Sequence, residues 1–260
     1  MHWLSPPRPE TPPVENRRMV IVEVVIVFTV TLGLSGAYSL VSLLDSLLRE
    51  QALADQKVAL NTQEATNQLL DILGQLLNAT RLIAWGALGL YLLWRAGMKL
   101  RDVGVYRRPH AGDVARAAGL ATLIGVPGLL FYLVARAVGA NLTVVPTTLD
   151  HWWQFVTLPL SAFGNAWAEE VLVVGYLITR LRQLGLRENS SLLVSAVLRG
   201  SYHLYQGFGG FVGNVIMGLV FGRVWQRTTR LWPLILAHFL IDFVAFVGYA
   251  ILRGHVAWLP

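Results

Sequence analysis

Two adjacent glutamates, Glu169 and Glu170, lie within the apolar segment NAWAEEVLVVGYL at residues 165–177. A charged side chain at the centre of a membrane-spanning helix costs about 2.5–3.5 kcal/mol on insertion, so a residue of this kind usually serves a function. Adjacent carboxylates in a medium of low dielectric constant resist ionising together. The pair could therefore supply both an acid and a base.

Further polar residues occur in the neighbouring apolar runs, in pairs four residues apart that would share one face of a helix. At a rise of 1.5 Å per residue, the acids and imidazoles fall near the middle of the membrane or in its cytoplasmic half. We expect them to meet around one hydrated cavity, where an acid, a base and hydrogen-bond donors could hydrolyse a peptide bond. The pairs are Asn165 with Glu169, Arg199 with His203, and His238 with Asp242.

The composition of the chain indicates a membrane protein. Of its 260 residues, 55% are hydrophobic and 14% are charged, and the mean hydropathy is +0.53, whereas a soluble domain usually carries about 25% charged residues. Apolar runs of about 20 residues predict membrane-spanning helices. We therefore predict an all-α fold, a polytopic membrane helix bundle with about seven transmembrane helices. The runs cover residues 19–44, 69–94, 113–137, 152–179, 190–206, 209–225 and 231–252.

The distribution of basic residues predicts how the chain crosses the membrane. Arginines and lysines cluster before the first run and after the second, fourth and sixth runs, and such clusters mark cytoplasmic loops. We expect a cytoplasmic N-terminus, an external C-terminus and a location in the plasma membrane. This topology accounts for the net charge of +6 without nucleic-acid binding, so the lipid bilayer is the expected partner. The excess of arginine over lysine favours a bacterial origin.

Composition also divides the chain into parts. The tail at 1–18 is rich in proline and charge, which predicts disorder. Segment 45–68 is expected outside the membrane, as an amphipathic or helical continuation of the first run. Glu23 and Asp71 lie near the ends of runs, and we expect their side chains to extend toward the membrane surface. The parts are the tail 1–18, N-terminal membrane helices 19–149, a helical core 150–252 with the polar runs, and a short tail 253–260.

The order of the polar motifs resembles that of the CPBP intramembrane proteases, which comprise the type II CAAX prenyl endopeptidases and the bacterial Abi or bacteriocin-processing proteins. The first motif of that family is EExxxR followed by Gly-Tyr-Leu, and this chain has EEVLVVGYL at 169–177. The second, FxxxH, corresponds to RGSYH at 199–203, and the third, HxxxN or HxxxD, to HFLID at 238–242. The resemblance covers about 150–250 and implies an intramembrane endopeptidase that acts on a membrane-associated protein or peptide.

The resemblance also implies roles for individual residues. Glu169, with His203, would activate the attacking water, and Glu170 would orient that pair. His238 and Asp242 correspond to the groups that stabilise the oxyanion, whereas Arg199 and Asn165 are supporting residues. The chemistry could use a metal-free glutamate or a divalent metal such as zinc, held by Glu169, His203, His238 and Asp242. The absence of cysteine excludes thiolate nucleophiles and cysteine-based zinc sites.

The chain departs from the family pattern at three positions. Val174 stands where the first motif has arginine, so the usual cation beside the acids is missing, and Arg199 stands where the second motif has phenylalanine. We hypothesise that Arg199 replaces that cation from the neighbouring helix. Asp242 stands where asparagine is common, and a carboxylate donates a hydrogen bond only when it is protonated. We therefore expect the Asp242 side chain to be either a metal ligand or a protonated acid.

Two other functions fit the same residues. The missing motif arginine at Val174 is compatible with an inactive family member that binds peptides or acts as a bacteriocin-immunity protein. Buried acids also occur in ion-coupled transporters. A transporter usually has matching broken helices in two halves, whereas this chain concentrates its polar residues in one half, which disfavours that interpretation.

Overall fold

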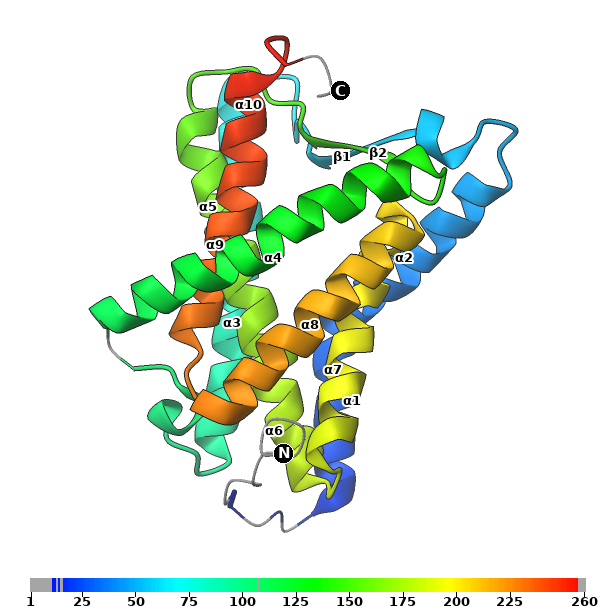
Figure 1. Ribbon diagram of the computed structural model, residues 1–260. Coiled ribbons are helices and arrows are strands. Elements are labelled where there is room, and N and C mark those ends of the chain that lie inside the picture. The colour runs from blue at the N-terminus through cyan, green and yellow to red at the C-terminus, as the bar shows by residue number, and fades with distance from the viewer. Residues whose placement is uncertain (1–10, 13, 15, 107, 257–260) are drawn as a thin grey trace.

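The protein is a bundle of long helices, which confirms the predicted all-α class (Figure 1). The computed structural model describes residues 11–256 except 13, 15 and 107, so most of the predicted disordered tail 1–18 and the end of the tail 253–260 lie outside the described residues. The α-helices are α1 (Arg17–Val30), α2 (Leu32–Leu47), α3 (Gln68–Arg95), α4 (Ala111–Ala137), α5 (Gln154–Glu169), α6 (Leu177–Gln183), α7 (Glu188–Ser201), α8 (Phe208–Thr228), α9 (Trp232–Phe243) and α10 (Tyr249–Leu252). The shorter elements are η1 (Leu53–Asp55), η2 (Leu100–Val103), η3 (Glu170–Tyr176), η4 (Leu204–Gln206), η5 (Val244–Gly248) and the strands β1 (Lys57–Asn61) and β2 (Thr143–Thr147).

By length and composition, four helical segments among the described residues could span a membrane, or five if the bent pair α1–α2 counts as one span. The four are α3, α4, α8 and the continuous rod Trp232–Leu252. The predicted count of about seven is not confirmed. A π-helix divides the run 152–179 after Glu169, and the helix in the run 190–206 ends at Ser201 after only 14 residues.

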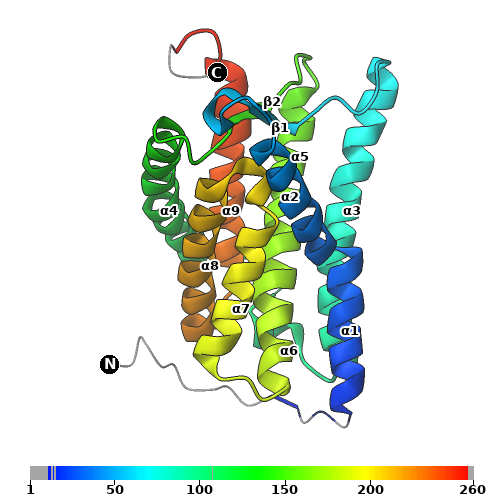
Figure 2. The same cartoon turned by 90° about the vertical axis from the view of Figure 1, so that its right-hand side faces the viewer.

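The first predicted span is broken rather than straight. Helices α1 and α2 meet at an angle of 51°, and Thr31 between them has φ −128° and ψ −126°, outside the helical region. Its hydroxyl donates to the carbonyl of Val27 at 2.6 Å. The bend directs α2 across the bundle toward the end of α7 (Figure 2). There Gly36 approaches Ser201 so closely that a β-carbon at position 36 would lie 2.6 Å from the serine hydroxyl.

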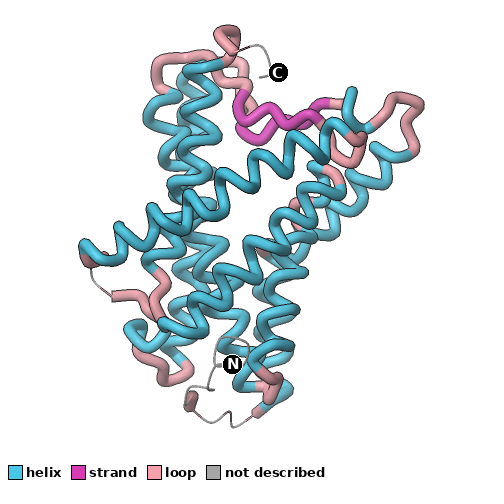
Figure 3. Tube along the Cα trace, viewed as in Figure 1, coloured by secondary structure: helices cyan, strands magenta, loops and turns pink. Residues whose placement is uncertain are grey.

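The prediction that 45–68 continues the first run as a helix was wrong. Helix α2 ends at Leu47, and the segment then forms η1 and strand β1, which pairs in parallel with β2. The register joins Lys57 with Thr143 and Asn61 with Thr147. Figure 3 shows this pair of strands, in magenta, at one end of the bundle. Residues Lys57–Asn61 are thus a short extended segment at the end of the bundle instead of part of a helix.

The connections between helices lie at two ends of the bundle. Figure 2 shows the start of α1 and the α6–α7 connection at one end, and the strands with α10 at the other. At the first end the Arg17 guanidinium donates to the carbonyl of Leu184 at 2.5 Å. At the other end Arg253 pairs with Asp150 at 2.6 Å. Which end faces the cytoplasm stays a prediction.

Asp71 does not extend to the surface as expected, and Glu23, which retains 27% of its side-chain exposure, has partners inside the protein. The Glu23 carboxylate accepts hydrogen bonds from the Tyr176 hydroxyl at 2.8 Å and from Arg180 Nε at 2.9 Å. Asp71 is fully buried and accepts from the backbone N–H of Glu64 at 2.6 Å, which holds the loop that precedes α3. Both acids have partners inside the protein, so extension to water would break hydrogen bonds that the fold supplies.

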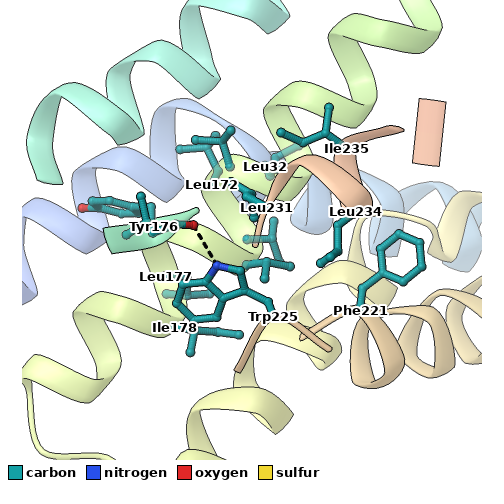
Figure 4. Packing of buried hydrophobic residues seen from close by; sticks show 14 of the residues in the cluster. Leu32, Leu172, Tyr176, Leu177, Ile178, Phe221, Trp225, Leu231, Leu234 and Ile235 are labelled. Atoms are coloured by element: carbon teal, nitrogen blue, oxygen red, sulfur yellow. Dashed lines mark hydrogen bonds between the residues drawn. The ribbon is translucent and has the colours of Figure 1, made fainter. Parts of the chain in front are cut away.

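A continuous segment of the main hydrophobic core follows directly after the two adjacent glutamates. Residues 171–178 are buried and pack against α8 and the start of α9. Figure 4 shows Trp225 at the centre of this cluster, beside Leu231 and Ile178. The indole N–H of Trp225 donates to the carbonyl of Val103 at 2.9 Å, so its one polar atom is paired. This packed core fixes the helix that carries the glutamates.

Candidate active site

The two glutamates lie where the helix changes its hydrogen-bonding pattern. Glu169 ends α5, and Glu170 begins the π-helix η3. Such π-helical turns are rare and frequently occur at functional sites. The wider turn is supported from α7, because the Ser195 hydroxyl donates to the carbonyl of Val173 at 2.7 Å. The acids are therefore presented from a rigid segment whose altered backbone has a specific partner.

Glu170 is fully buried within a set of charged groups. Its Oε1 accepts from Arg199 Nη2 at 2.5 Å and lies 2.9 Å from His238 Nδ1. Arg199 is also fully buried, and its guanidinium lies over the ring of Phe221 at 5.9 Å. Buried charges are stable only when paired. Arg199 and His238 thus supply the partners that an ionised Glu170 requires.

Glu169 has a different environment, although it is the next residue. Its Oε2 accepts a hydrogen bond from the Tyr202 hydroxyl at 2.8 Å, and Arg199 Nη1 is 3.9 Å from the same oxygen. The Glu169 side chain retains 11% of its exposure, whereas that of Glu170 retains none. Of the two acids, Glu169 is the one that a solute could reach.

His203 reaches the site from a turn rather than from a helix face. Helix α7 ends at Ser201, so the reasoning that placed Arg199 and His203 on one helical face was wrong for the second residue. The imidazole packs edge-to-face against Tyr202, with ring centres 4.9 Å apart. It lies close enough to Arg199 and His238 for electrostatic interaction. Its Nδ1 is buried and has no hydrogen-bond partner among the described residues.

His238 and Asp242 follow each other on one face of α9, as their spacing predicted. His238 Nε2 lies 3.7 Å from Asp242 Oδ2, while Nδ1 faces Glu170. Asn165 of α5 interacts with the Asp242 carboxylate. A second π-helix, η5, begins two residues after Asp242. The ring of His238 thus lies between two carboxylates from different helices.

The structure brings all the sequence-predicted site residues into one cluster. They come from three regions that lie side by side: α5 with η3, the end of α7, and α9. This arrangement does not favour a metal centre: within the described part of the chain, no group of three or more His, Cys, Asp or Glu side chains is placed to hold a metal ion. The guanidinium of Arg199 also occupies the space beside both carboxylates, where it would repel a cation.

Sequence reasoning missed Tyr202 as a partner of Glu169. A usable signal was present, because a tyrosine within an apolar run needs a partner for its hydroxyl and Tyr202 precedes a site histidine. On a regular helix, however, neighbouring residues point about 100° apart. Helix α7 ends at Ser201, which the sequence does not mark. Because the chain leaves the helix there, Tyr202 and His203 can both point toward the site.

Comparison with known proteins agrees with the motifs. Residues 151–244 match the family model described as type II CAAX prenyl endopeptidase Rce1-like. No curated protein and no solved structure gives a significant match to the chain. The matched segment contains both glutamates, His203, His238 and Asp242. Over residues 151–244 the chain is therefore similar to the Rce1-like type II CAAX prenyl endopeptidases.

Proposed function

We propose that the protein is an intramembrane endopeptidase in which Glu169 is the general base. The observation that carries the proposal is the contrast between the two acids. Glu170 is sealed from solvent and paired with Arg199, whereas the Glu169 side chain, although largely buried, retains 11% of its exposure. In the described contacts of Glu169, only Oε2 accepts a hydrogen bond. Its other oxygen, Oε1, is available to accept a proton from water.

The reaction would be hydrolysis of one peptide bond. Glu169 takes a proton from water as the water oxygen bonds to the scissile carbonyl carbon. The tetrahedral intermediate then collapses, the carbon–nitrogen bond breaks, and the proton on Glu169 passes to the leaving amine. General base catalysis of this kind contributes about 10²–10⁴-fold to the rate. His203 lies beside the base, and its unpaired Nδ1 could hold the water or a substrate group.

The charges behind Glu169 would stabilise the intermediate. His238 has carboxylate oxygens at 2.9 and 3.7 Å from its two ring nitrogens, so both nitrogens can carry protons. A protonated imidazole and the nearby Arg199 would favour negative charge on the scissile oxygen. Donors that are fixed before the reaction stabilise such charge efficiently. Glu170 would keep both cations in place.

The substrate we propose is the C-terminal region of a membrane-associated protein or peptide, as in CAAX-type processing. The site lies within a bundle whose outer helices are apolar enough to span a bilayer. A substrate anchored in the same membrane would therefore reach it by lateral diffusion. We propose the plasma membrane as the location, with the N-terminus in the cytoplasm.

The proposal is tested by comparing C-terminal peptides of membrane proteins from wild-type and Glu169→Gln cells. The variant should accumulate uncleaved substrates, because glutamine keeps the shape of glutamate but accepts no proton at neutral pH. Glu50→Gln is the matched control, since Glu50 is an exposed glutamate in the loop after α2. Identical peptides in wild-type and Glu169→Gln cells would refute the base assignment.

The inactive, peptide-binding alternative makes a different prediction in the same experiment. It rested on the missing motif arginine, but the structure supplies a cation to Glu170 from Arg199. An inactive relative would leave the peptides unchanged, whereas a purified chain that cleaves a membrane peptide excludes it. An ion-coupled transporter would likewise give no cleavage, and it would catalyse ion uptake into vesicles that Glu169→Gln abolishes.

A further inference from the structure

We propose that Tyr202 is a positioning residue for Glu169 and that helix α2, which lies outside the matched domain, holds Tyr202 in place through Ser39. This inference rests on the proposed function of Glu169 as the general base. It extends the site to a residue of the N-terminal half of the chain.

The contact between Tyr202 and Glu169 is specific and buried. The tyrosine retains 6% of its exposure, and its hydroxyl donates to Glu169 Oε2 at 2.8 Å. Hydrogen bonds to an ionised carboxylate are among the stronger ones in proteins. Because this bond engages Oε2, the carboxylate cannot turn freely, and Oε1 is held as the oxygen that faces away from the tyrosine. Tyr202 therefore selects which oxygen acts as the base.

The backbone at Tyr202 is fixed by α2. The Ser39 hydroxyl donates to the Tyr202 carbonyl at 2.9 Å, and both residues are buried. This carbonyl lies just beyond the end of α7, where a helix leaves its last carbonyls without intrahelical partners. One turn earlier on α2, Gly36 lets the backbone approach Ser201. Gly36 and Ser39 thus form one face of α2 that contacts the end of α7.

The bend between α1 and α2 contributes to the position of Tyr202. A straight helix through residues 17–47 would not lean across the bundle as α2 does after the 51° bend. The bend brings Ser39 to the turn that carries both Tyr202 and His203. Small displacements of a catalytic group cost about 10²-fold in rate. Loss of the Ser39 hydrogen bond should therefore displace Tyr202 and, through it, the Glu169 carboxylate.

The test compares two tyrosine variants of the full-length, purified protein on one cleaved membrane peptide. Tyr202→Phe removes the hydroxyl that contacts Glu169, and kcat should fall by about 10- to 100-fold with KM unchanged. Tyr176→Phe is the matched control, because Tyr176 is also a buried tyrosine whose hydroxyl donates to a glutamate, Glu23, at 2.8 Å. It should keep the wild-type kcat and KM.

Two serine variants test the link to α2. Ser39→Ala should lower kcat in the same direction as Tyr202→Phe, by about three- to tenfold, because a neutral hydrogen bond is weaker than one to a carboxylate. Ser35→Ala is the matched control, since among the described contacts the Ser35 hydroxyl bonds to the Thr31 carbonyl one turn earlier in the chain and to no residue of α7. It should leave kcat unchanged.

The outcomes separate this inference from the proposed function. An active wild type with an unaffected Tyr202→Phe variant would overturn the positioning role alone, and so would equal losses in Tyr202→Phe and Tyr176→Phe. An unaffected Ser39→Ala variant would overturn the role of α2. A wild type whose cleavage is unaltered by Glu169→Gln would overturn the proposed base, and the inference with it.

Discussion

Arg199 and Glu170, from different helices, form an ion pair of 2.5 Å in which neither side chain is exposed to solvent. In the family pattern, the arginine beside the acids stands four residues after the second glutamate. Here that position is Val174, which is fully buried in the hydrophobic core. The structure thus contains the contact that was hypothesised from the sequence, while its role in catalysis stays a proposal.

Removal of Arg199 should abolish activity and also destabilise the fold. Arg199→Leu removes the arginine from the buried Glu170 and leaves His238 as its remaining partner, at a cost of about 3–5 kcal/mol. The double variant Arg199→Leu with Glu170→Leu should regain most of that stability but remain inactive. Thermal unfolding in detergent measures the stability, and peptide cleavage measures the activity. A double variant as unstable as the single one would show that the charge pair is not the cause.

A cation restored at the family position should recover part of the function. Arg199→Leu with Val174→Arg places an arginine four residues after Glu170, as in the family motif. We expect cleavage to return above the level of Arg199→Leu alone. Val174→Leu in the same background is the control, since it fills the position without charge. No recovery would mean that Arg199 does more than neutralise Glu170, for example by contacting the substrate.

The sequence predicted most residues of the candidate site and the contact of Arg199 with Glu170, but not Tyr202 or its hydrogen bond to Glu169. Titratable side chains in apolar runs are costly, and this cost singled out Glu169, Glu170, His203 and His238. The contacts depend on where helices stop. The π-helix at Glu170 and the end of α7 at Ser201 are set by packing between helices, as in the bond from Ser195 to the Val173 carbonyl.

The same reason explains the errors in the fold. Hydropathy marks apolar length but does not show a bend such as the one at Thr31. Pairing of β1 with β2 joins segments about 86 residues apart, such as Lys57 with Thr143. No local pattern in either segment identifies the other. Long-range partners also account for Glu23, whose hydrogen bonds come from residues more than 150 positions away.

Asp242 should tolerate replacement by the residue that is common in the family. Asp242 Oδ2 lies 3.7 Å from His238 Nε2, and an asparagine carbonyl at this position could also accept a hydrogen bond from that nitrogen. Asp242→Asn should therefore retain most of the cleavage rate, whereas Asp242→Ala, which removes the acceptor, should lower kcat by about tenfold or more. Equal loss in both variants would show that the negative charge of Asp242 is required.

Chelation should leave the activity unchanged. A metal ion would have to displace the Arg199 guanidinium from Glu170 and the His238 ring from its two carboxylates. We therefore expect the same cleavage rate after prolonged treatment with EDTA or 1,10-phenanthroline. A thermolysin sample in the same buffer provides the positive control for chelation. Loss of activity that added zinc restores would contradict the metal-free mechanism.

The ion pair between Glu23 and Arg180 should matter for stability and not for catalysis. Arg180 is buried, and its Nη2 lies 2.6 Å from Glu23 Oε1. Glu23→Ala leaves this guanidinium without its carboxylate and should lower the free energy of unfolding by about 1–3 kcal/mol, less than for a completely buried pair because Glu23 retains 27% of its exposure. Asp45→Ala is the matched control, since the pair of Asp45 with Arg49 is exposed and should contribute no more than about 0.5 kcal/mol.

Both stability variants should keep the wild-type kcat per folded molecule, because Glu23 contacts none of the site residues in the described structure. Unfolding in detergent with cleavage assayed on the same samples measures both quantities. A Glu23→Ala variant that unfolds like wild type would show that Arg180 finds another acceptor, and the nearest are the Gln183 side chain at 2.8 Å and the Leu92 carbonyl at 3.1 Å. A Glu23→Ala variant with wild-type stability but a lower kcat would instead show that α1 affects catalysis.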